Sequence, residues 1–599
     1  MVILGISALY HDSAAAIIID GKVKVAMHEE RFSRVKHDKS FPLNAIRACL
    51  EDCSLTIANV DIVTYYEKPL LKFERLLDTF HQHAPKGLNT FLKSMPKWGK
   101  ESLFIKKIIR KELGKLGIIK EKTKILFSEH HLSHASQSYF GSGYNNAAIL
   151  VIDGVGEWVT STIGYGHGNK IKILEEQHYP HSLGLLYSSF TYFLGFKVNS
   201  GEYKLMGLAP FGDDNSNEYQ KYKRLILDNL LTVKKNGSIT INQSFFDYSI
   251  GSKMIKTNKW EKLFGIKKRE PESKLNLSHC NLALAIQHLV EDISLRIVKY
   301  VKKLTNSNNL CLSGGFFLNG AVNGKIVESN IFENVHVPFA PGDAGGAIGA
   351  CLAIWNIYLE KKTHNNTINN VYLGRKYEDK LIKNELLKKN AFFVKYSKFD
   401  ALISDVTTLL SEGKIIGWYQ GRSEFGPRAL GNRSILADPR LVNAQNVINN
   451  DVKFRESFRP FAPAILQSHA NQYFNIVSSP HMQFVKEIRQ EYQFIIKDKH
   501  SRTIVEQLQL PRSPFPSITH VDFTSRVQTV NRKDNERFWQ LLTHFHNSTG
   551  CPMLLNTSFN IRGEPIVETP YDALNCFYSS GIDYLVINNF LLKKRIWNR

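Results

Sequence analysis

Hydrophobic runs near the start of the chain predict paired β-strands. Two nearly continuous apolar runs, VILGISAL and AAAIIID, come before the turn sequence DGK at 20–22. Short apolar runs bounded by such a turn are typical of buried strands joined as a hairpin. A second pair of this kind follows in 146–158 and 160–174. We therefore expect an α/β fold whose architecture is duplicated, although the sequence itself is not repeated.

Helical periodicity dominates several later segments. Residues 275–304 place apolar side chains at i, i+3 and i+4, which predicts a long helix leading into the short strand within NLCLSGGFFLNG. The stretch DAGGAIGACLAIW is expected to be a tightly packed helix because its residues are small. Residues 106–122 predict an amphipathic helix with a basic outer face.

Changes in composition indicate the domain organisation. A first domain is expected over 1–360, with a polar insertion rich in lysine and asparagine at about 212–275. The polar stretch KKTHNNTINN at 361–370 is the best linker candidate. Arginine becomes frequent afterwards, so a second domain is expected over 371–599.

The net charge narrows the choice of partners only slightly. Lysine and arginine number 77 and aspartate and glutamate 55, which leaves +22. Nucleic acid, a membrane surface or anionic substrates would each fit this value, but so would solvated lysine-rich faces, which we favour for 106–122. We expect no stable nucleic-acid partner.

The chain carries no sign of export or membrane insertion. No apolar run reaches 18 residues, and the first 25 residues lack the basic region and the cleavage site of a signal peptide. The seven cysteines are scattered, as expected for reduced thiols. These features favour a cytoplasmic protein.

A histidine pair in SEHHLSHA is the first candidate site. His130 and His134 would point about 40° apart on one helix face and could share an ion. His131 would face elsewhere, in the surroundings of the site or on the surface. The spacing alone does not exclude ordinary helix histidines. Asp153, after the run AILVI, and Asp343, among glycines, are candidate further ligands, although Asp343 could instead cap a helix. Such a set suits Fe(II), Mn or Zn.

Glycine-rich stretches favour a nucleotide, but each is weak evidence by itself. Backbone N–H groups in GISALYHDSA, IDGVGEW, CLSGGFFLNG and APGDAGGAIGA could approach phosphate or adenosine. None is a Walker A loop. Gly154 belongs to the second of these stretches.

Arginines in the second half of the chain form another candidate set. Their fork-shaped side chains suit phosphate, and FRPFAP embeds one of them among aromatic residues and prolines, where a solvated charge is not expected. Surface ion pairing remains the alternative for any single arginine. The set comprises Arg422, Arg428, Arg433, Arg455, Arg459 and Arg562, with Asn556, Ser558 and Asn560 as neutral hydrogen-bonding groups after a strand.

Taken in order, the motifs resemble those of the O-carbamoyltransferases of the nodulation-protein NodU and cephem carbamoyltransferase type. The resemblance covers nearly the whole chain, and its last three motifs are long and specific. It rests on YHDSAA, EERFSRVKHD, EHHLSHASQSYF, VIDGVGEW, GEYKLMGLAPFG, LSGGFFLN, GDAGGAIGA, GPRALGNRSILADPR, VKFRESFRPFAPA and NTSFNIRGEPIV.

The resemblance implies a fold and a reaction. The N-terminal part would have the actin-like ATPase fold, in the branch shared with the tRNA threonylcarbamoyl transferase, and the C-terminal part would be a YrdC-type domain. ATP, with Mg²⁺, and carbamoyl phosphate would give carbamoyl adenylate in the C-terminal domain. The carbamoyl group would then pass to an acceptor hydroxyl at a metal in the N-terminal domain, with Fe(II) expected first.

The resemblance also implies roles for residues, carried over position by position. Three residues are expected to be catalytic, with His11 as general base: His11, Lys453 and Arg459. The implied metal ligands are His130, His134, Asp153 and Asp343. Nucleotide contacts would come from Gly154, Gly314, Gly315 and Asn319. Contacts to carbamoyl phosphate or its adenylate would come from Arg428, Arg433, Lys453, Arg455, Arg459, Arg526, Asn556, Ser558 and Arg562. The acceptor would contact His11, Asp12 and Lys36.

Three other functions compete with this assignment. An ATP-dependent sugar kinase would share the N-terminal fold but leave the arginines without a role. A tRNA-modifying enzyme would need a basic stripe, for which only 106–122 qualifies. A non-catalytic metal or nucleotide binder is disfavoured because every expected catalytic position is filled. The acceptor is open, with a sugar, nucleotide-sugar or natural-product hydroxyl expected, and a homodimer is one allowed assembly.

Overall fold

The structure is a computed structural model that describes residues 1–361, 368, 370–496 and 502–594. The chain divides into two compact units. Unit 1 contains Met1–Glu29 and His37–Ile368, and unit 2 contains Glu30–Lys36 and Asn369–Arg599. The short segment Glu30–Lys36 therefore leaves the N-terminal part of the chain and belongs to the C-terminal unit. Most of the expected linker at 361–370 lies outside the described residues.

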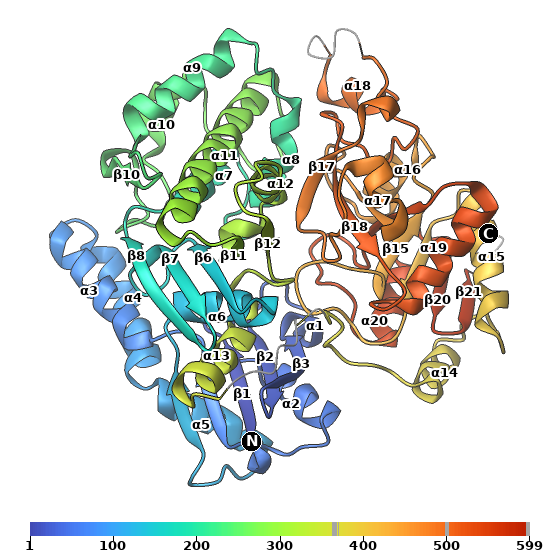
Figure 1. The fold of residues 1–599 in the computed structure, drawn as a ribbon, viewed down its shortest axis with the longest axis horizontal. Coiled ribbons are helices and arrows are strands. Elements are labelled where there is room, and N and C mark those ends of the chain that lie inside the picture. Colours follow the sequence, from blue (N-terminus) through green and yellow to red (C-terminus); the bar gives the residue numbers. More distant parts are fainter. Residues whose placement is uncertain (362–367, 369, 497–501, 595–599) are drawn as a thin grey trace. The chain divides into compact units, whose positions relative to one another are not determined.

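Unit 1 is built from two five-stranded sheets of the same topology. The first has the order β3-β2-β1-β4-β5 and the second the order β8-β7-β6-β11-β12 (Figure 1). In each sheet the first three strands are antiparallel and the last two are parallel to the central strand. The strands are β1 (Val2–Ser7), β2 (Ala14–Ile19), β3 (Lys22–His28), β4 (Ile62–Tyr65), β5 (Lys124–Phe127), β6 (Asn146–Ile152), β7 (Val159–His167), β8 (Lys170–His178), β11 (Asn309–Ser313) and β12 (Asn334–His336).

The duplicated architecture is the one predicted, with one correction. Each predicted strand pair is part of a three-stranded antiparallel ribbon. The DGK turn joins β2 to β3, whereas the loop between β1 and β2 is longer and contains His11. The third strand was missed in both halves. The start of β3 is exposed or half-buried and lacks a continuous apolar run, and the segment 160–174, taken as one strand, contains β7 and the start of β8.

The helices of unit 1 include the predicted long one. Residues Leu277–Thr305 form α11, and the small-residue stretch forms α13 (Gly346–Ala353). The basic helix α5 (Ile105–Leu113) is shorter than expected because the chain turns at Gly114 and Gly117. The others are α2 (Leu43–Asp52), α3 (Pro69–His83), α4 (Leu88–Leu103), α6 (His130–Ser142), α7 (Leu183–Phe193), α8 (Glu202–Leu208), α9 (Asn217–Leu225), α10 (Thr257–Phe264) and α12 (Gly320–Glu328).

Helices α6 and α13 form the centre of unit 1. Helix α13 packs on β1 and β2, helix α6 packs on β6 and β11, and the two helices lie side by side (Figure 1). Their close approach depends on glycine. A Cβ atom on Gly349 would lie 1.9 Å from the carbonyl oxygen of Ser133. This packing holds the start of α6 next to the turn that precedes α13.

The segment at 212–275 is folded rather than a loose loop. It contains α9, α10 and the hairpin of β9 (Leu231–Val233) and β10 (Ile239–Ile241). Trp260 is fully buried against Phe190 and Phe193 of α7, and its ring N–H donates to the Phe245 carbonyl at 3.0 Å. The aromatic core ties this segment to the rest of unit 1.

Unit 2 is centred on one nine-stranded mixed sheet. Its order is β13-β21-β20-β14-β15-β19-β16-β18-β17 (Figure 1). The strands are β13 (Phe393–Lys395), β14 (Ile416–Tyr419), β15 (Arg433–Ala437), β16 (Ala462–Leu466), β17 (Phe484–Glu487), β18 (Thr524–Val530), β19 (Met553–Ser558), β20 (Tyr584–Ile587) and β21 (Phe590–Lys593). The helices are α1 (Glu30–Ser33), α14 (Asp379–Lys388), α15 (Phe399–Ser411), α16 (Ala444–Val447), α17 (Gln467–Phe474), α18 (Ile504–Gln509), α19 (Glu536–Thr549) and α20 (Pro570–Tyr578).

The segment Glu30–Lys36 is held in unit 2 by its arginines. Arg34 donates to the carbonyls of Ile566 and Pro565 at 2.8 and 2.9 Å. Arg31 is buried and donates to the Gly426 carbonyl at 3.3 Å. Charged side chains that donate to backbone carbonyls are a strong form of hydrogen bond, so this segment is an integral part of unit 2.

A bilayer-spanning helix is not found in unit 1 or unit 2. Within residues 1–361, 368, 370–496 and 502–594, every helix is either too short or too polar to cross a membrane. This agrees with the expectation drawn from the sequence.

Replacing Gly349 with alanine tests the contact between α6 and α13. We expect Gly349→Ala to destabilise the protein by about 1–3 kcal/mol, because the added methyl group meets the backbone of Ser133. Gly99→Ala in α4 is the matched control, since nothing lies within 4 Å of its added Cβ atom. Alanine there should be neutral or stabilise the helix by up to about 1 kcal/mol. Thermal unfolding of both variants measures the difference, and equal melting temperatures would contradict the packing described.

Candidate metal and anion sites

Four side chains of unit 1 converge at the amino-terminal end of α6. His130 and His134 lie one helical turn apart on α6, Asp153 follows β6, and Asp343 begins the turn before α13. One ligand atom from each of the four lies within 4.8 Å of every other. The two histidines and Asp343 are almost fully buried. Residues far apart in sequence are thus brought to one point, as predicted.

The distances in this cluster fit a bound cation. The Nε2 atoms of His130 and His134 are 3.1 Å apart. Asp153 Oδ2 lies 2.9 Å from Nε2 of His130, and Asp343 Oδ1 lies 3.6 Å from Nε2 of His134. Two ligands held about 2.0–2.2 Å from one tetrahedral or octahedral ion are separated by about 3–3.5 Å. The cluster therefore has nearly the spacing of a ligand set.

Charge also favours a divalent ion here. Without a metal, burial lowers the pKa of His134, but its hydrogen bonds to Asp153 and Asp343 outweigh this and raise it to about 9. Burial raises the pKa of Asp153, yet the hydrogen bonds from the two histidines hold it well below its usual range. Two ionised carboxylates and two neutral imidazoles would balance a divalent cation.

Neighbouring groups hold the ligands in place. The backbone N–H of Gly315 donates to Asp153 Oδ1 at 3.0 Å, which leaves Oδ2 for the cluster. Glu157 accepts the backbone N–H of His130 at 3.0 Å and that of Lys68 at 2.7 Å. Its buried carboxylate therefore satisfies an otherwise unpaired donor in the first turn of α6.

The middle histidine of the motif has a different environment. His131 is buried, and its Nδ1 lies 2.8 Å from the Thr162 hydroxyl. Burial and the neighbouring His130 lower the pKa of His131 well below its usual range. A neutral, buried histidine turned toward β7 supports the fold, so a surface location for it was wrong.

His11 stands at the edge of the metal cluster. Its Nε2 atom is 3.5 Å from Asp343 Oδ2, and its side chain is 24% exposed. Burial lowers the pKa of His11, but Asp343 and the hydrogen bond to Asp12 raise it to about 9. This value differs from the near-neutral one expected from the sequence, because two carboxylates flank the ring.

Two of the three glycines predicted to contact a nucleotide, Gly314 and Gly315, have structural reasons to be glycine. Gly314 adopts a φ of 98°, and an added Cβ atom would lie 2.2 Å from the Ile152 carbonyl oxygen. A Cβ atom on Gly315 would meet Asp153 Oδ1 at 2.8 Å. Gly154 has more room, with only Leu185 within 4 Å. Asn319 caps α12 by accepting the N–H of Val322 at 3.2 Å. These contacts account for Gly314, Gly315 and Asn319 without a bound nucleotide.

The ammonium group of Lys453 in unit 2 is surrounded by oxygen atoms. It is buried and contacts the backbone oxygen and hydroxyl of Ser558 and both oxygens of Asn560. Burial lowers the pKa of Lys453 well below its usual range, and the charges of Arg455, Arg459 and Lys36 add to this effect. Lys36, expected near the acceptor, thus acts electrostatically within unit 2.

Two predicted arginines of unit 2, Arg428 and Arg459, act electrostatically on a third, the half-buried Arg526. Burial, with the like charges of Arg428 and Arg459, lowers the pKa of Arg526 well below its usual range. Within the described part of unit 2, the buried Nε atom of Arg526 has no hydrogen-bond partner. A nearby acid pairs loosely with Arg459, since Glu456 lies 3.7 Å from it. Like charges held together in this way favour an anionic ligand.

Other predicted residues of this set support the fold or lie apart. Arg433 is fully buried, donates to the carbonyls of Gln420 and Asn432 at 2.6 and 3.0 Å, and lies 3.6 Å from the Tyr419 ring centroid. Its two terminal nitrogens thus donate to the protein, which gives Arg433 a structural role, while its buried Nε atom has no hydrogen-bond partner in the described residues. Arg422 donates to the Leu373 carbonyl at 3.2 Å.

The remaining predicted contacts have mixed environments. Arg455 donates to Asn449 at 2.7 Å and stacks over Phe461 at 4.6 Å. Asn556 is buried and donates to Gln528 at 2.8 Å, while its Oδ1 atom has no partner among the described residues. Arg562 is exposed. Among Arg455, Asn556 and Arg562, it is Asn556 that has a buried side-chain atom without a hydrogen-bond partner in the described residues.

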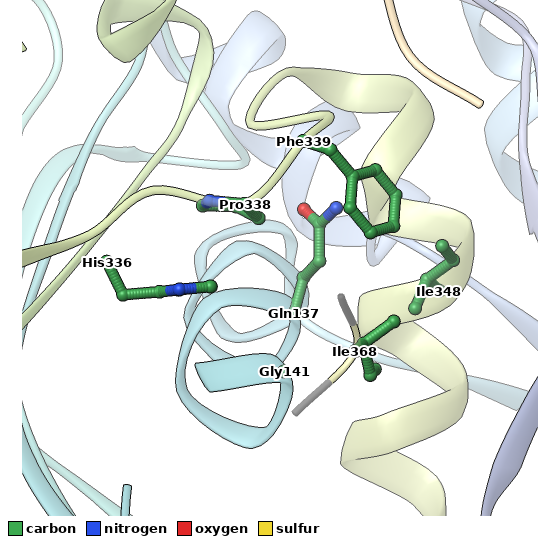
Figure 2. Close-up of a pocket in the computed structure, with 7 residues that line it drawn as sticks. All are labelled: Gln137, Gly141, His336, Pro338, Phe339, Ile348 and Ile368. Carbon is green, nitrogen blue, oxygen red and sulfur yellow. The ribbon is translucent and has the colours of Figure 1, made fainter. Parts of the chain in front are cut away.

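A small cavity lies beside the metal cluster but cannot hold a substrate. It is lined by Gln137 of α6, Ile348 of α13 and neighbouring apolar side chains (Figure 2). Its volume is about 10 Å³, which is close to the space needed by a single water molecule. The Gln137 amide has no hydrogen-bond partner in the described residues, so a water would suit it.

Sequence reasoning missed residues that shape both sites. Glu424 accepts the backbone N–H groups of Leu430, Asn432 and Arg433 at 2.8, 2.8 and 3.2 Å, which shapes the arginine-rich loop. Glu157 was noted only as part of a motif. Glu157 stands in a glycine-rich loop without a basic neighbour in sequence, which is a local sign that a carboxylate serves the backbone. Glu424 lies two residues after Arg422 and has no such sign.

Metal content tests the His–Asp cluster. We expect His134→Ala to weaken metal binding by more than about 100-fold. Loss of a residue that only hydrogen-bonds to a metal ligand already lowers metal affinity by about 10–100-fold, and loss of a ligand itself should lower it further. His131→Asn is the matched control on the same helix, since it keeps a polar group near Thr162 and removes no ligand. Elemental analysis of purified protein measures the metal. Equal losses in both variants would show that the effect comes from damage to α6.

Anion binding tests the arginine cluster. Inorganic phosphate or pyrophosphate should relieve the repulsion around Arg526. At a ligand concentration of 100 times the dissociation constant, binding should raise the free energy of unfolding by about 2.7 kcal/mol, and the melting temperature should rise with it. Arg526→Met should abolish this shift. Arg532→Ala is the control, because Arg532 is exposed and pairs with Glu536. A shift that survives in Arg526→Met would place the anion elsewhere.

Comparison with known proteins agrees with the two-part organisation of the chain. Residues 2–352 match the family model described as carbamoyltransferase N-terminus, and residues 407–594 match the one described as carbamoyltransferase C-terminus. An uncharacterised protein of Synechocystis sp. is 46% identical over 601 residues, which covers 99% of this chain and 96% of that protein. Nodulation protein NolNO of Sinorhizobium fredii is 34% identical over 590 residues, covering 98% of this chain and 79% of that protein.

Solved structures give a weaker likeness. Component A of the (R)-2-hydroxyglutaryl-CoA dehydratase of Acidaminococcus fermentans matches with a TM-score of 0.30 and 14% identity, covering 59% of this chain and 96% of that one. A score this low carries no argument. The family models alone span most of both units, and they confirm the resemblance found in the motifs: the chain belongs to the carbamoyltransferase family and is an enzyme of that family.

Proposed function

We propose that this enzyme is an ATP-dependent O-carbamoyltransferase with two separate reaction sites. Unit 2 would convert ATP, carbamoyl phosphate and one water molecule into carbamoyl adenylate, phosphate and pyrophosphate. Unit 1 would transfer the carbamoyl group to a hydroxyl of a sugar-like or natural-product acceptor. The observation that supports this proposal is the difference between the two places, since arginines gather in unit 2 and two histidines and two aspartates that could hold a metal ion gather in unit 1.

The unit 2 site suits the first reaction. Carbamoyl phosphate and the ATP phosphates are both anionic and would repel each other in water. Arg428, Arg459 and Arg526 supply clustered positive charge, and the Lys453 ammonium stands in a fixed cradle of oxygens. Held in place before the reaction, these charges would stabilise the anionic groups in two steps. Water would first cleave carbamoyl phosphate into carbamate and phosphate, and a carbamate oxygen would then attack the α-phosphorus of ATP as the bond from that phosphorus to pyrophosphate breaks.

The unit 1 site suits the second reaction. The acceptor oxygen forms a bond to the carbamoyl carbon, the bond from that carbon to the adenylate oxygen breaks, and AMP leaves. His11 Nε2 is the group placed to take the proton of the acceptor hydroxyl, since it is partly exposed beside the cluster. A cation held by the cluster would offset the Asp343 charge that raises the pKa of His11, and this would favour the neutral ring that the step requires. A divalent ion on His130, His134, Asp153 and Asp343 would supply charge neutralisation for the leaving phosphate.

The finer assignments belong to this proposal as well. The N- and C-terminal units would have the actin-like and YrdC-like folds, and the repeated strand order of unit 1 supports the first of these. Fe(II) is the expected ion, with Mn or Zn as the alternatives that the same nitrogen and oxygen ligands accept. ATP, its Mg²⁺ and carbamoyl phosphate imply action in the cytoplasm.

The test is to incubate the metal-loaded enzyme with ATP and isotope-labelled carbamoyl phosphate without an acceptor. We expect labelled carbamoyl-AMP, phosphate and pyrophosphate. Lys453→Ala, Arg459→Ala and Arg526→Met should abolish all three, whereas His134→Ala should still form them, since it alters the other unit. Arg532→Ala is the control for loss of a positive charge.

Two results would contradict the proposal. ADP as the product would favour a sugar kinase, which needs no anion site in unit 2. If the enzyme turned over neither without an acceptor nor with a panel of sugar acceptors, carbamoyl transfer to sugar hydroxyls would be excluded. Label appearing in tRNA instead would identify a tRNA-modifying enzyme.

A further inference from the structure

Three side chains of unit 1 form a continuous row that ends at the metal cluster. His37 Nδ1 lies 2.7 Å from Asp12 Oδ1, and His11 Nδ1 lies 2.9 Å from Asp12 Oδ2. His11 Nε2 then lies 3.5 Å from Asp343 Oδ2. One carboxylate is thus shared by two imidazoles, and its oxygens face one ring each.

This arrangement selects one form of His11. A carboxylate accepts hydrogen bonds and does not donate them when ionised, so the Nδ1 atom that faces Asp12 must carry the hydrogen. The neutral ring of His11 then has its lone pair on Nε2, which is the nitrogen that faces the cluster. His37 occupies the other oxygen of Asp12, which prevents this carboxylate from turning away from His11.

The backbone around the row is also specialised. Leu9, Asp12 and His37 have φ values of 72°, 53° and 56°, in the left-handed region that non-glycine residues seldom adopt. Two backbone bonds clamp the loops together, from Leu9 N–H to the Lys39 oxygen at 3.0 Å and from Ser13 N–H to the Asp38 oxygen at 2.9 Å. Such local strain persists only where surrounding contacts hold it, as these loops do.

We propose that His37 and Asp12 are positioning residues that hold His11 in the orientation and tautomer required for carbamoyl transfer. This inference rests on the proposed function of His11 as the proton acceptor. It changes the expected role of Asp12, whose two oxygens are occupied by histidines rather than turned toward an acceptor molecule. It also adds His37, to which the motif had given no role.

The position of His37 along the chain adds a constraint. His37 is the first residue of unit 1 after the segment Glu30–Lys36, which belongs to unit 2. The bond from His37 to Asp12 therefore fixes the point where the chain re-enters unit 1. A structural role in closing this loop is the competing explanation, so the test must separate the two.

The first experiment compares His37→Ala with His37→Asn. Asparagine can place an N–H donor where Nδ1 of histidine stands, whereas alanine cannot. With the best acceptor from the sugar panel, we expect kcat to fall about 10- to 100-fold in His37→Ala, because misplacement of a reacting group by about 1 Å has this effect. His37→Asn should recover most of the loss. KM for the acceptor should change little in either variant.

Two controls separate positioning from folding. Ser40→Ala removes the hydrogen bond from Ser40 to Asp38, at 2.6 Å, in the same loop without touching the row. It should leave kcat unchanged. Formation of carbamoyl-AMP without an acceptor should stay at the wild-type rate in all three variants, since that reaction belongs to unit 2. An unchanged kcat in His37→Ala, equal losses in Ser40→Ala, or no rescue by asparagine would overturn the proposal.

A second readout does not depend on activity. In ¹⁵N-histidine-labelled, Zn²⁺-loaded protein, we expect the neutral form of His11 to carry its hydrogen on Nδ1, with the signal assigned by its loss in His11→Gln. Asp12→Asn should shift the hydrogen toward Nε2. The same tautomer in both proteins would overturn the positioning role. Because this measurement needs neither ATP nor acceptor, failure of the proposed function can be told apart from failure of this inference.

Discussion

The mutual neutralisation of Asp153, Asp343 and two histidines is the interaction on which unit 1 depends. Two carboxylates buried together repel each other and would favour protonation if they stood alone. Here each faces the imidazoles of His130 and His134, and the pKa of both carboxyls is lowered despite burial. A cation in the same place would satisfy the four groups more fully, so the fold and the metal are expected to support each other.

The fold brings these groups together through close backbone contacts. Asp153 follows a central strand, and Asp343 precedes a helix that can approach α6 only because residue 349 has no side chain. Gly315 is needed next to Asp153 for the same reason. These glycines were first considered as places for phosphate to approach. In the structure their small size serves the placement of the carboxylates.

In unit 2 the charges that lie together have the same sign. Its site keeps like charges close together and partly withdrawn from water, which costs stability in the absence of a ligand. Glu424 shapes the arginine-rich loop through backbone bonds, and Arg433 is occupied by carbonyl groups. The charges of Arg428 and Arg459 act on Arg526 and help to lower its pKa, and in so buried an environment an added negative charge is stabilised more strongly than in water.

The sequence by itself determined the strand and helix patterns, the spacing of His130 and His134 on one helix face, and the membership of the carbamoyltransferase family, because these depend on local periodicity and on ordered motifs. It could not separate Arg433, which donates to backbone carbonyls, from Arg526, which lies among other arginines, because the two look alike until their neighbours are known. Nor could it show that His37 meets Asp12, because that contact joins two loops. Such pairings depend on long-range packing, which only the tertiary structure decided.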